Sequence, residues 1–204
     1  IDRSRGLGDV YKRQGLFTCD AALSAALAKT KSRVILGPRT ASKTSDFQIP
    51  EGLPPLVPDA ISPARVTHVE TLANGLHVDM ESMPGHFWRW REFAVPVGDA
   101  EVITSTADGR PALLRRGQLD YLCGWPDPEY LGNLLADHCQ RVGIMTMTMP
   151  EGVRMRRAGN RGFVVNYSDV EVDLKSFAGP CRIDHGSSKL PPSGIAILTF
   201  ECHD

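Results

Sequence analysis

Apolar and polar residues follow two different periods in the first part of the chain. Between residues 19 and 31 the apolar positions recur at helical spacing, and one face carries Ala22, Leu23, Ala26 and Leu27. Thr18 or Asp20 can cap this helix at its N-terminus. Residues 34–36 then form a short run of branched apolar side chains, which is typical of a buried strand. The pattern predicts a helix followed by a strand, the repeating step of an α/β domain.

The middle of the chain predicts several more strands. Residues 66–72 and 76–81 have strand character on either side of Asn74-Gly75, a dipeptide that indicates a β-hairpin. Further strands are predicted at residues 101–106, 111–114 and 118–123, the first two of them on either side of Asp108-Gly109.

A second helix is predicted directly after these strands. Asp127 lies at the N-cap position, Pro128 at the first helical position and Glu129 in the first turn, and Gly143 ends the helix. Its apolar stripe consists of Tyr130, Leu131, Leu134, Leu135, His138 and Val142. His138 therefore lies on a packing face, where a core histidine is expected rather than a metal ligand.

Beyond residue 148 the helical period disappears and short alternating segments follow. They lie at residues 153–157, 162–167, 170–174 and 195–200, with a turn at residues 158–161. In the third segment we expect Val170, Val172 and Leu174 to face inward. The sequence therefore predicts two domains of different class, an α/β domain over residues 15–148 and a small antiparallel all-β domain over residues 149–204.

Composition and charge exclude several functional classes. The 204 residues include 42% hydrophobic residues and carry a formal net charge of −1, so they show no basic surface for nucleic acid or an anionic membrane. No apolar run approaches the roughly 18–20 residues of a membrane helix. The five cysteines are widely spaced and lack a C-x-x-C pair, which indicates free thiols in the cytoplasm rather than disulfides or a zinc site. We expect no cofactor and no metal.

Residues 1–14 differ from the rest of the chain. Asp9, Val10, Tyr11, Lys12, Arg13 and Gln14 spell the translation of the mosaic-end adapter of transposase-based sequencing libraries. We interpret the segment as a sequencing artefact in front of an incomplete gene. The alternative is a natural basic arm, because arginines and lysines cluster here.

The loop after the first predicted strand resembles a phosphate-binding loop. Gly37, Lys43 and Thr44 fit the pattern G-x-x-x-x-G-K-[ST], but Ser42 replaces its second glycine. The proline-rich continuation to Pro55 cannot begin the helix that such a loop requires. A nucleotide-binding module over residues 37–44 is thus a minor alternative.

A cysteine-dependent amidotransferase is the second alternative. His68 and Glu70 have the H-x-E spacing of a base with its orienting carboxylate, and Cys19 lies upstream as the nucleophile. A catalytic thiol needs small neighbours and a setting that stabilises the thiolate. Phe17 and Asp20 provide neither, so this alternative is also disfavoured.

Aromatic residues crowd one segment of the middle region. Trp88, Trp90 and Phe93 alternate with Arg89, Arg91 and Glu92. Such a cluster can stack against a sugar or form a domain or subunit contact, and the contact is the favoured interpretation.

Segments throughout the chain resemble glycoside hydrolase family 42 β-galactosidases. They are Gly37-Pro38-Arg39, Ser42-Lys43-Thr44, Asp46-Phe47-Gln48-Ile49-Pro50, Trp90-Arg91-Glu92, Tyr121-Leu122-Cys123-Gly124-Trp125-Pro126, Phe163-Val164-Val165-Asn166-Tyr167 and Leu190-Pro191-Pro192-Ser193-Gly194. The resemblance implies a partial flavodoxin-like, class I glutamine amidotransferase-like domain that serves homotrimer formation, followed by the family's C-terminal β domain.

The resemblance assigns no catalytic residue to this chain. In that family the two catalytic glutamates lie on a (β/α)8 barrel that precedes the matching region, and the enzyme hydrolyses terminal β-D-galactosides with retention. No glutamate here matches a family catalytic motif, so we interpret Glu70, Glu81, Glu92, Glu101 and Glu151 as structural or surface groups. The sequence thus predicts a non-catalytic part of a larger hydrolase.

Overall fold

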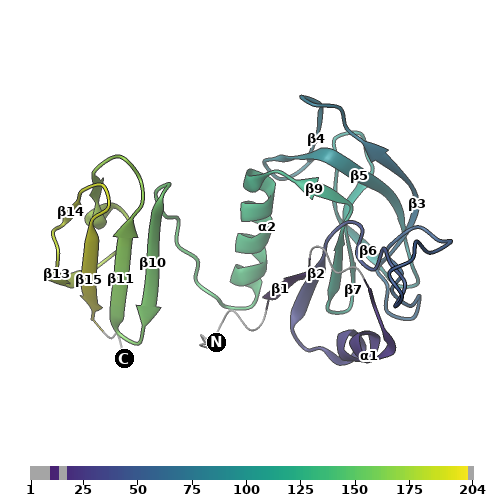
Figure 1. Ribbon diagram of the computed structural model, residues 1–204, viewed down its shortest axis with the longest axis horizontal. Coiled ribbons are helices and arrows are strands. Elements are labelled where there is room, and N and C mark those ends of the chain that lie inside the picture. Colours follow the sequence, from purple (N-terminus) through teal and green to yellow (C-terminus); the bar gives the residue numbers. More distant parts are fainter. Residues whose placement is uncertain (1–9, 14–17, 202–204) are drawn as a thin grey trace. The chain divides into compact units, whose positions relative to one another are not determined.

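The computed structural model describes residues 10–13 and 18–201 and divides the chain into two compact units, Ile1–Met145 and Thr146–Asp204. The described residues form mostly β-sheet, with only two α-helices (Figure 1). Neither of these helices is long and apolar enough to span a membrane. The first unit is thus richer in strands than the predicted α/β domain.

The predicted helix and strand at the start of the first unit are confirmed. Helix α1 (Ala21–Lys29) begins at Asp20, whose carboxylate accepts a hydrogen bond of 2.7 Å from the backbone N–H of Leu23. This bond satisfies one of the N–H groups that a helix start leaves without a partner. Strand β2 (Arg33–Leu36) follows, and three of its four residues are buried.

A five-stranded mixed sheet forms the centre of the first unit. In spatial order it contains β1 (Val10–Arg13), β2, β8 (Leu119–Leu122), β7 (Pro111–Arg116) and β6 (Glu101–Ser105). Strands β1, β2 and β8 are parallel, whereas β7 and β6 are antiparallel to their neighbours. Strand β1 belongs to the segment that the sequence marks as an artefact, and it occupies the edge beside β2.

A second sheet surrounds the longest strand, β5 (His86–Pro96). Strand β3 (Ala64–Thr71) pairs with the C-terminal half of β5, β4 (His77–Asp79) with its N-terminal end, and β9 (Gly124–Pro126) also pairs with β5. The predicted hairpin at Asn74-Gly75 is therefore wrong, because β3 and β4 follow one another along β5 instead of pairing together. The turn itself is present, and Gly75 adopts a φ of 86° that favours glycine.

An irregularity in β5 changes which side chains face the core. Phe87 and Glu92 are both buried although they are five residues apart, an odd spacing that a regular strand would place on opposite faces. Between them Arg89 adopts a φ of 67°, and the register with β9 shifts between Phe87 and Arg91. The shift explains why Phe87 and Glu92 are both buried despite their odd spacing.

Helix α2 (Pro128–Arg141) closes the first unit as predicted. The carboxylate of Asp127 accepts hydrogen bonds from the backbone N–H groups of Glu129 and Tyr130. The helix buries Tyr130, Leu134 and His138. Val142 was expected in the apolar stripe but is 40% exposed, because the helix has ended before it.

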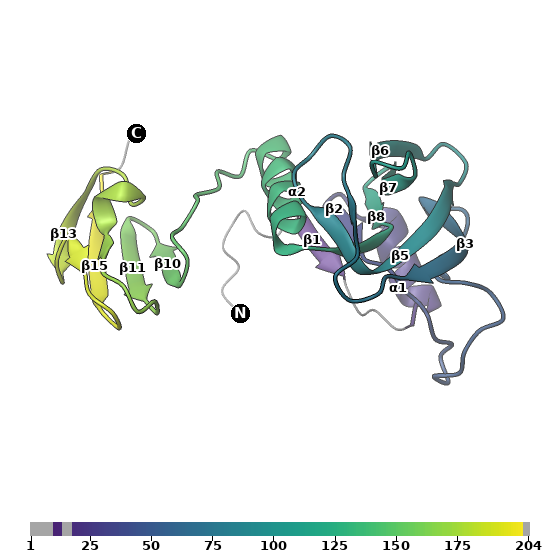
Figure 2. The same cartoon turned by 90° about the horizontal axis from the view of Figure 1, so that it is seen from above.

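The second unit contains a four-stranded antiparallel sheet whose strands lie side by side in both views (Figures 1 and 2). Its spatial order is β10 (Val153–Ala158), β11 (Arg161–Asn166), β15 (Ile195–Phe200) and β13 (Cys181–His185). A small layer of β12 (Val172–Asp173), a 3-10 turn (Leu174–Ser176) and β14 (Lys189–Leu190) supplies further core residues. Val170 was predicted to face inward but is 58% exposed, since the strand begins only at Val172.

Candidate functional site

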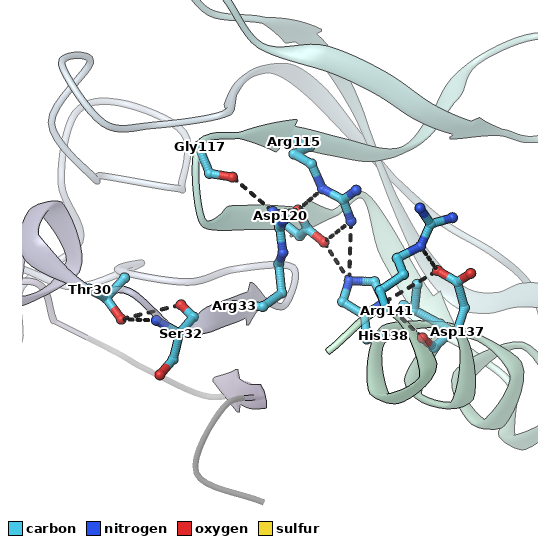
Figure 3. Close-up of polar contacts among 10 residues, drawn as sticks. Thr30, Ser32, Arg33, Arg115, Gly117, Asp120, Asp137, His138 and Arg141 are labelled. Atoms are coloured by element: carbon cyan, nitrogen blue, oxygen red, sulfur yellow. Dashed lines mark hydrogen bonds and ion pairs between the residues drawn. The ribbon is translucent and has the colours of Figure 1, made fainter. Parts of the chain in front are cut away.

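A buried polar cluster joins helix α2 to the central sheet (Figure 3). Asp120 on β8 is fully buried and accepts two hydrogen bonds from Arg115, at 2.7 Å from Nε and 2.8 Å from Nη2. His138 on α2 contacts the same carboxylate through Nε2 at 2.5 Å, and Arg33 on β2 approaches it at 3.4 Å. The cluster thus connects β2, β7, β8 and α2 through one carboxylate.

His138 lies between two acceptors and a guanidinium. Its Nδ1 lies 2.8 Å from the carbonyl oxygen of Leu134. Its Nε2 lies 2.5 Å from the Asp120 carboxylate and 3.4 Å from Arg115 Nη2. Burial acts most strongly on the pKa of Asp120 and would raise it, but the hydrogen bonds from Arg115 and His138 outweigh burial and lower that pKa. Asp120 and His138 are buried and the two arginines are only partly exposed, which indicates a structural role.

A second buried carboxylate, that of Glu92 on β5, binds groups from three segments of the chain. Glu92 is 3% exposed and accepts hydrogen bonds of 3.0 Å from the Trp90 indole Nε1 and 3.0 Å from the backbone N–H of Arg39, together with one from the Tyr121 hydroxyl. Burial raises the pKa of Glu92, and burial with the neighbouring Glu92 carboxylate raises that of Tyr121 well above its usual value. Glu92 thus fixes β5, β8 and the loop after β2 in one arrangement.

A small pocket, which we call the tryptophan–arginine pocket, lies beside this carboxylate. Arg39, Arg89, Trp90 and Trp125 line a cavity of about 210 Å³. The guanidinium of Arg39 lies 5.3 Å from the centre of the Trp90 ring, and that of Arg89 lies 4.0 Å from the Trp88 ring. Both arginines adopt left-handed backbone conformations, with φ of 61° and 67°. Such conformations are costly for residues other than glycine and cluster where a fixed geometry is needed.

The residues of the amidotransferase alternative have separate partners. The Cys19 thiol lies 3.2 Å from the Ser24 hydroxyl. The His68 ring stacks on Phe93 at 3.8 Å, and Glu70 forms an ion pair with Arg91 at 2.5 Å. In the described part of the chain no polar contact joins Cys19 with His68 or Glu70, so the structure does not favour this alternative.

The loop of the nucleotide-binding alternative lacks the helix that the motif requires. Thr40 donates to the carbonyl oxygen of Gly37 at 2.7 Å, and Thr44 accepts from the backbone N–H of Gln48. These contacts form successive turns, and no helix follows them before β3. Among residues 10–13 and 18–201, no group of three or more His, Cys, Asp or Glu side chains could hold a metal ion.

Sequence reasoning identified only part of the tryptophan–arginine pocket. Arg89 and Trp90 were already named in the aromatic cluster of the sequence, whereas Arg39 and Trp125 are identified as lining residues only in the structure. Trp125 joins the pocket because β9 pairs with β5, a contact between segments more than thirty residues apart. Gly124 permits this pairing, since a Cβ atom there would lie 2.5 Å from the Phe87 ring.

The curated proteins that resemble this chain in sequence are β-galactosidases. The chain is 36% identical over 174 residues to a β-galactosidase of Thermus thermophilus and 37% identical over 174 residues to one of a Thermus species. Each match covers 84% of this chain but 26% of the relative, so the chain spans about a quarter of the length of the curated relatives it matches. No family model matches the chain.

Solved structures of similar fold agree with these relatives. The crystal structure of a β-galactosidase from the psychrophilic Marinomonas ef1 matches 95% of this chain and 29% of its own, with a TM-score of 0.83 and 26% identity. A GH42 β-galactosidase from G. stearothermophilus matches 93% of this chain and 31% of its own, with a TM-score of 0.71. At 10% identity this second match concerns the fold alone.

Proposed function

Because these comparisons support a fragment of a glycoside hydrolase family 42 β-galactosidase, we propose that the chain is a non-catalytic C-terminal region of such an enzyme. The observation that carries the proposal is the 36% identity over 174 residues to a relative of which the match covers 26%. In this proposal the parent enzyme hydrolyses terminal β-D-galactosides with retention.

The proposal places the chemistry outside this chain. Retaining glycoside hydrolysis needs two carboxyl groups about 5 Å apart on either side of the scissile bond. Three glutamates are already engaged, Glu92 by three hydrogen-bond donors, Glu70 by Arg91 and Glu171 by Lys189. Glu81, Glu101 and Glu151 are exposed side chains of turns and a strand end. We assign catalysis to the remainder of the parent, in the cytoplasm.

We also propose a domain assignment for the two parts of the chain. We assign residues 15–148 to a partial amidotransferase-like domain and residues 149–204 to the C-terminal β domain. The parallel strands β2 and β8 and the helix that precedes β2 support the first assignment, because helices alternate with parallel strands in that class. The all-antiparallel pairing of the second unit supports the second assignment.

We further propose that the chain acts in assembly, as a contact in a homotrimeric parent. Exposed apolar side chains support this role, since Phe47 is 68% exposed and Ile49 is 83% exposed on the loop after β2. Apolar surface of this kind marks contact sites when it is contiguous.

A chimera tests the proposal. The matching segment of the Thermus thermophilus β-galactosidase is replaced by this chain, and a second variant deletes the segment. We expect the chimera to keep the assembly mass of the intact enzyme and to hydrolyse a chromogenic β-galactoside, and the deletion variant to lose that mass. An inactive chimera of correct mass would contradict the non-catalytic role, and a deletion variant of unchanged mass would contradict the assembly role.

A further inference from the structure

We propose that the tryptophan–arginine pocket binds a sugar acid, with the carboxylate at Arg39 and Arg89 and the sugar ring against the indoles of Trp90 and Trp125. The carboxylate preference stands on the geometry of the pocket alone. The choice of a sugar as the body of the ligand rests on the proposed function.

The first observation is that the three tryptophans of the chain lie at or beside this pocket. The chain contains three tryptophans. Two of them line the pocket, and the third, Trp88, stacks beneath the Arg89 guanidinium that also lines it. Indole faces carry negative charge density and attract cations and polarised C–H groups, which a pyranose ring presents.

The second observation is that these side chains are held in place before any ligand arrives. The Trp90 indole donates to the buried Glu92, and the Trp88 indole donates to the carbonyl oxygen of Pro126 at 3.2 Å. Glu92 also holds the backbone of Arg39 in its left-handed conformation. A fixed pocket loses little conformational freedom on binding, which favours affinity.

The third observation concerns the chemistry of the lining. Arginine and tryptophan side chains offer only hydrogen-bond donors. Within the described residues, neither Arg39 nor Arg89 has an ion-pair partner within 4 Å, although the charge of Arg39 acts on the nearby Glu92 carboxylate, where burial raises the pKa and this charge lowers it. That carboxylate already accepts three hydrogen bonds. The pocket therefore suits a ligand rich in acceptors, and a carboxylate binds guanidinium groups more strongly than a neutral oxygen does.

The size of the pocket limits the size of the ligand that it can hold. Its volume of about 210 Å³ lies below the roughly 300–1,000 Å³ of sites for drug-sized molecules. One ring with one carboxylate fits this volume, and the further units of an oligosaccharide would lie outside the pocket. These properties together describe a single hexuronate.

Tryptophan fluorescence gives a local assay, because all three tryptophans lie at or beside the pocket. The complete chain is titrated with D-galacturonate, with D-galactose, with acetate and with the peptide Gly-Glu-Gly. We expect saturable quenching with galacturonate and at least tenfold weaker binding of the other three ligands. Galactose lacks the carboxylate, acetate lacks the ring, and the peptide carries a carboxylate on a flexible chain.

Two variants on different strands locate the site. Arg89→Ala removes a charge-assisted contact and Trp125→Ala removes a stacking surface, and each should weaken galacturonate binding at least tenfold. Arg110→Ala is the matched control, because Arg110 lies over the Phe93 ring at 5.6 Å and does not line the pocket. Its affinity should be unchanged. Each variant is used only if its thermal transition matches that of the wild type, and one folded variant is sufficient.

Three results of the titration would contradict the proposal. Absence of saturable quenching would overturn the proposal, as would equal affinity for galactose or for acetate. Equal affinity for Gly-Glu-Gly would reassign the pocket to a protein side chain. The outcome is independent of the chimera experiment, which measures galactoside hydrolysis and assembly and not binding to this pocket.

Discussion

Replacing Asp120 with asparagine should lower the free energy of unfolding of the first unit by about 3–5 kcal/mol, the usual cost of removing one partner from a buried ion pair. Asp120 is fully buried and receives hydrogen bonds from Arg115 and His138. Asparagine keeps the shape of the side chain but leaves the Arg115 guanidinium without its counter-charge. For a unit of this size the loss corresponds to a fall in melting temperature of roughly 10–15 °C.

An exposed pair of the same chemistry provides the control. Asp59 binds Arg65 at 2.6 Å, but both side chains are more than half exposed. Asp59→Asn should cost at most about 1 kcal/mol, because water screens the pair and replaces its hydrogen bonds. Urea unfolding followed by tryptophan fluorescence reports on the first unit alone, since the second unit contains no tryptophan.

The pH dependence gives a second readout of the same cluster. The pKa of Asp120 is lower in the folded state than its usual value of 3.8, so its stabilisation is complete above that value. The stabilisation is lost as the pH falls through the lower folded-state pKa. Asp120→Asn should therefore show a smaller loss of stability than the wild type between pH 4 and strongly acidic pH. Equal costs for Asp120→Asn and Asp59→Asn would refute the reasoning.

Three further predictions follow from other features. Gly85→Ala should lower the free energy of unfolding by about 1–3 kcal/mol more than Gly109→Ala does. Both glycines have positive φ, but only at Gly85 would the new Cβ lie 2.5 Å from the Tyr130 backbone nitrogen. Equal urea midpoints for the two variants would contradict this. Under native conditions iodoacetamide should modify Cys139 and spare Cys123. Cys123 is buried, and burial raises the pKa of its thiol above the usual value, so little reactive thiolate forms. Mass spectrometry of digested peptides measures the modification of each cysteine. The isolated chain should hydrolyse neither a chromogenic β-galactoside nor glutamine, and glutaminase activity abolished by Cys19→Ala would reverse our interpretation.

Local signals in the sequence predicted the helices correctly. Asp20 and Asp127 are good caps because a short carboxylate reaches the backbone N–H groups two or three residues ahead, a contact that depends on neighbours alone. The strands β2, β10, β11 and β15 were also predicted, since each is a compact run with an apolar face. Elements that depend on contacts between neighbouring residues can therefore be predicted from the sequence.

Long-range pairing was the part that the sequence did not reveal. Asn74-Gly75 is a good turn, but the partner of the flanking strands is β5, a segment whose apolar alternation is broken at Arg89. The same break hides the pocket, because Trp90 and Trp125 come together only through the pairing of β5 with β9. Arg39 could not be assigned either, since its position depends on the buried carboxylate of Glu92.

Strand β10 has a consequence for aggregation that folding stability does not measure. It lies at the edge of its sheet and carries Arg154, Arg156 and Arg157 within six residues. An open edge can recruit a strand from another molecule, and positive charges in both strands make such recruitment costly. Exchanging these arginines for threonine should shorten the lag before fibrils form. The arginines would then lower the rate at which molecules associate, an effect that a melting temperature does not report.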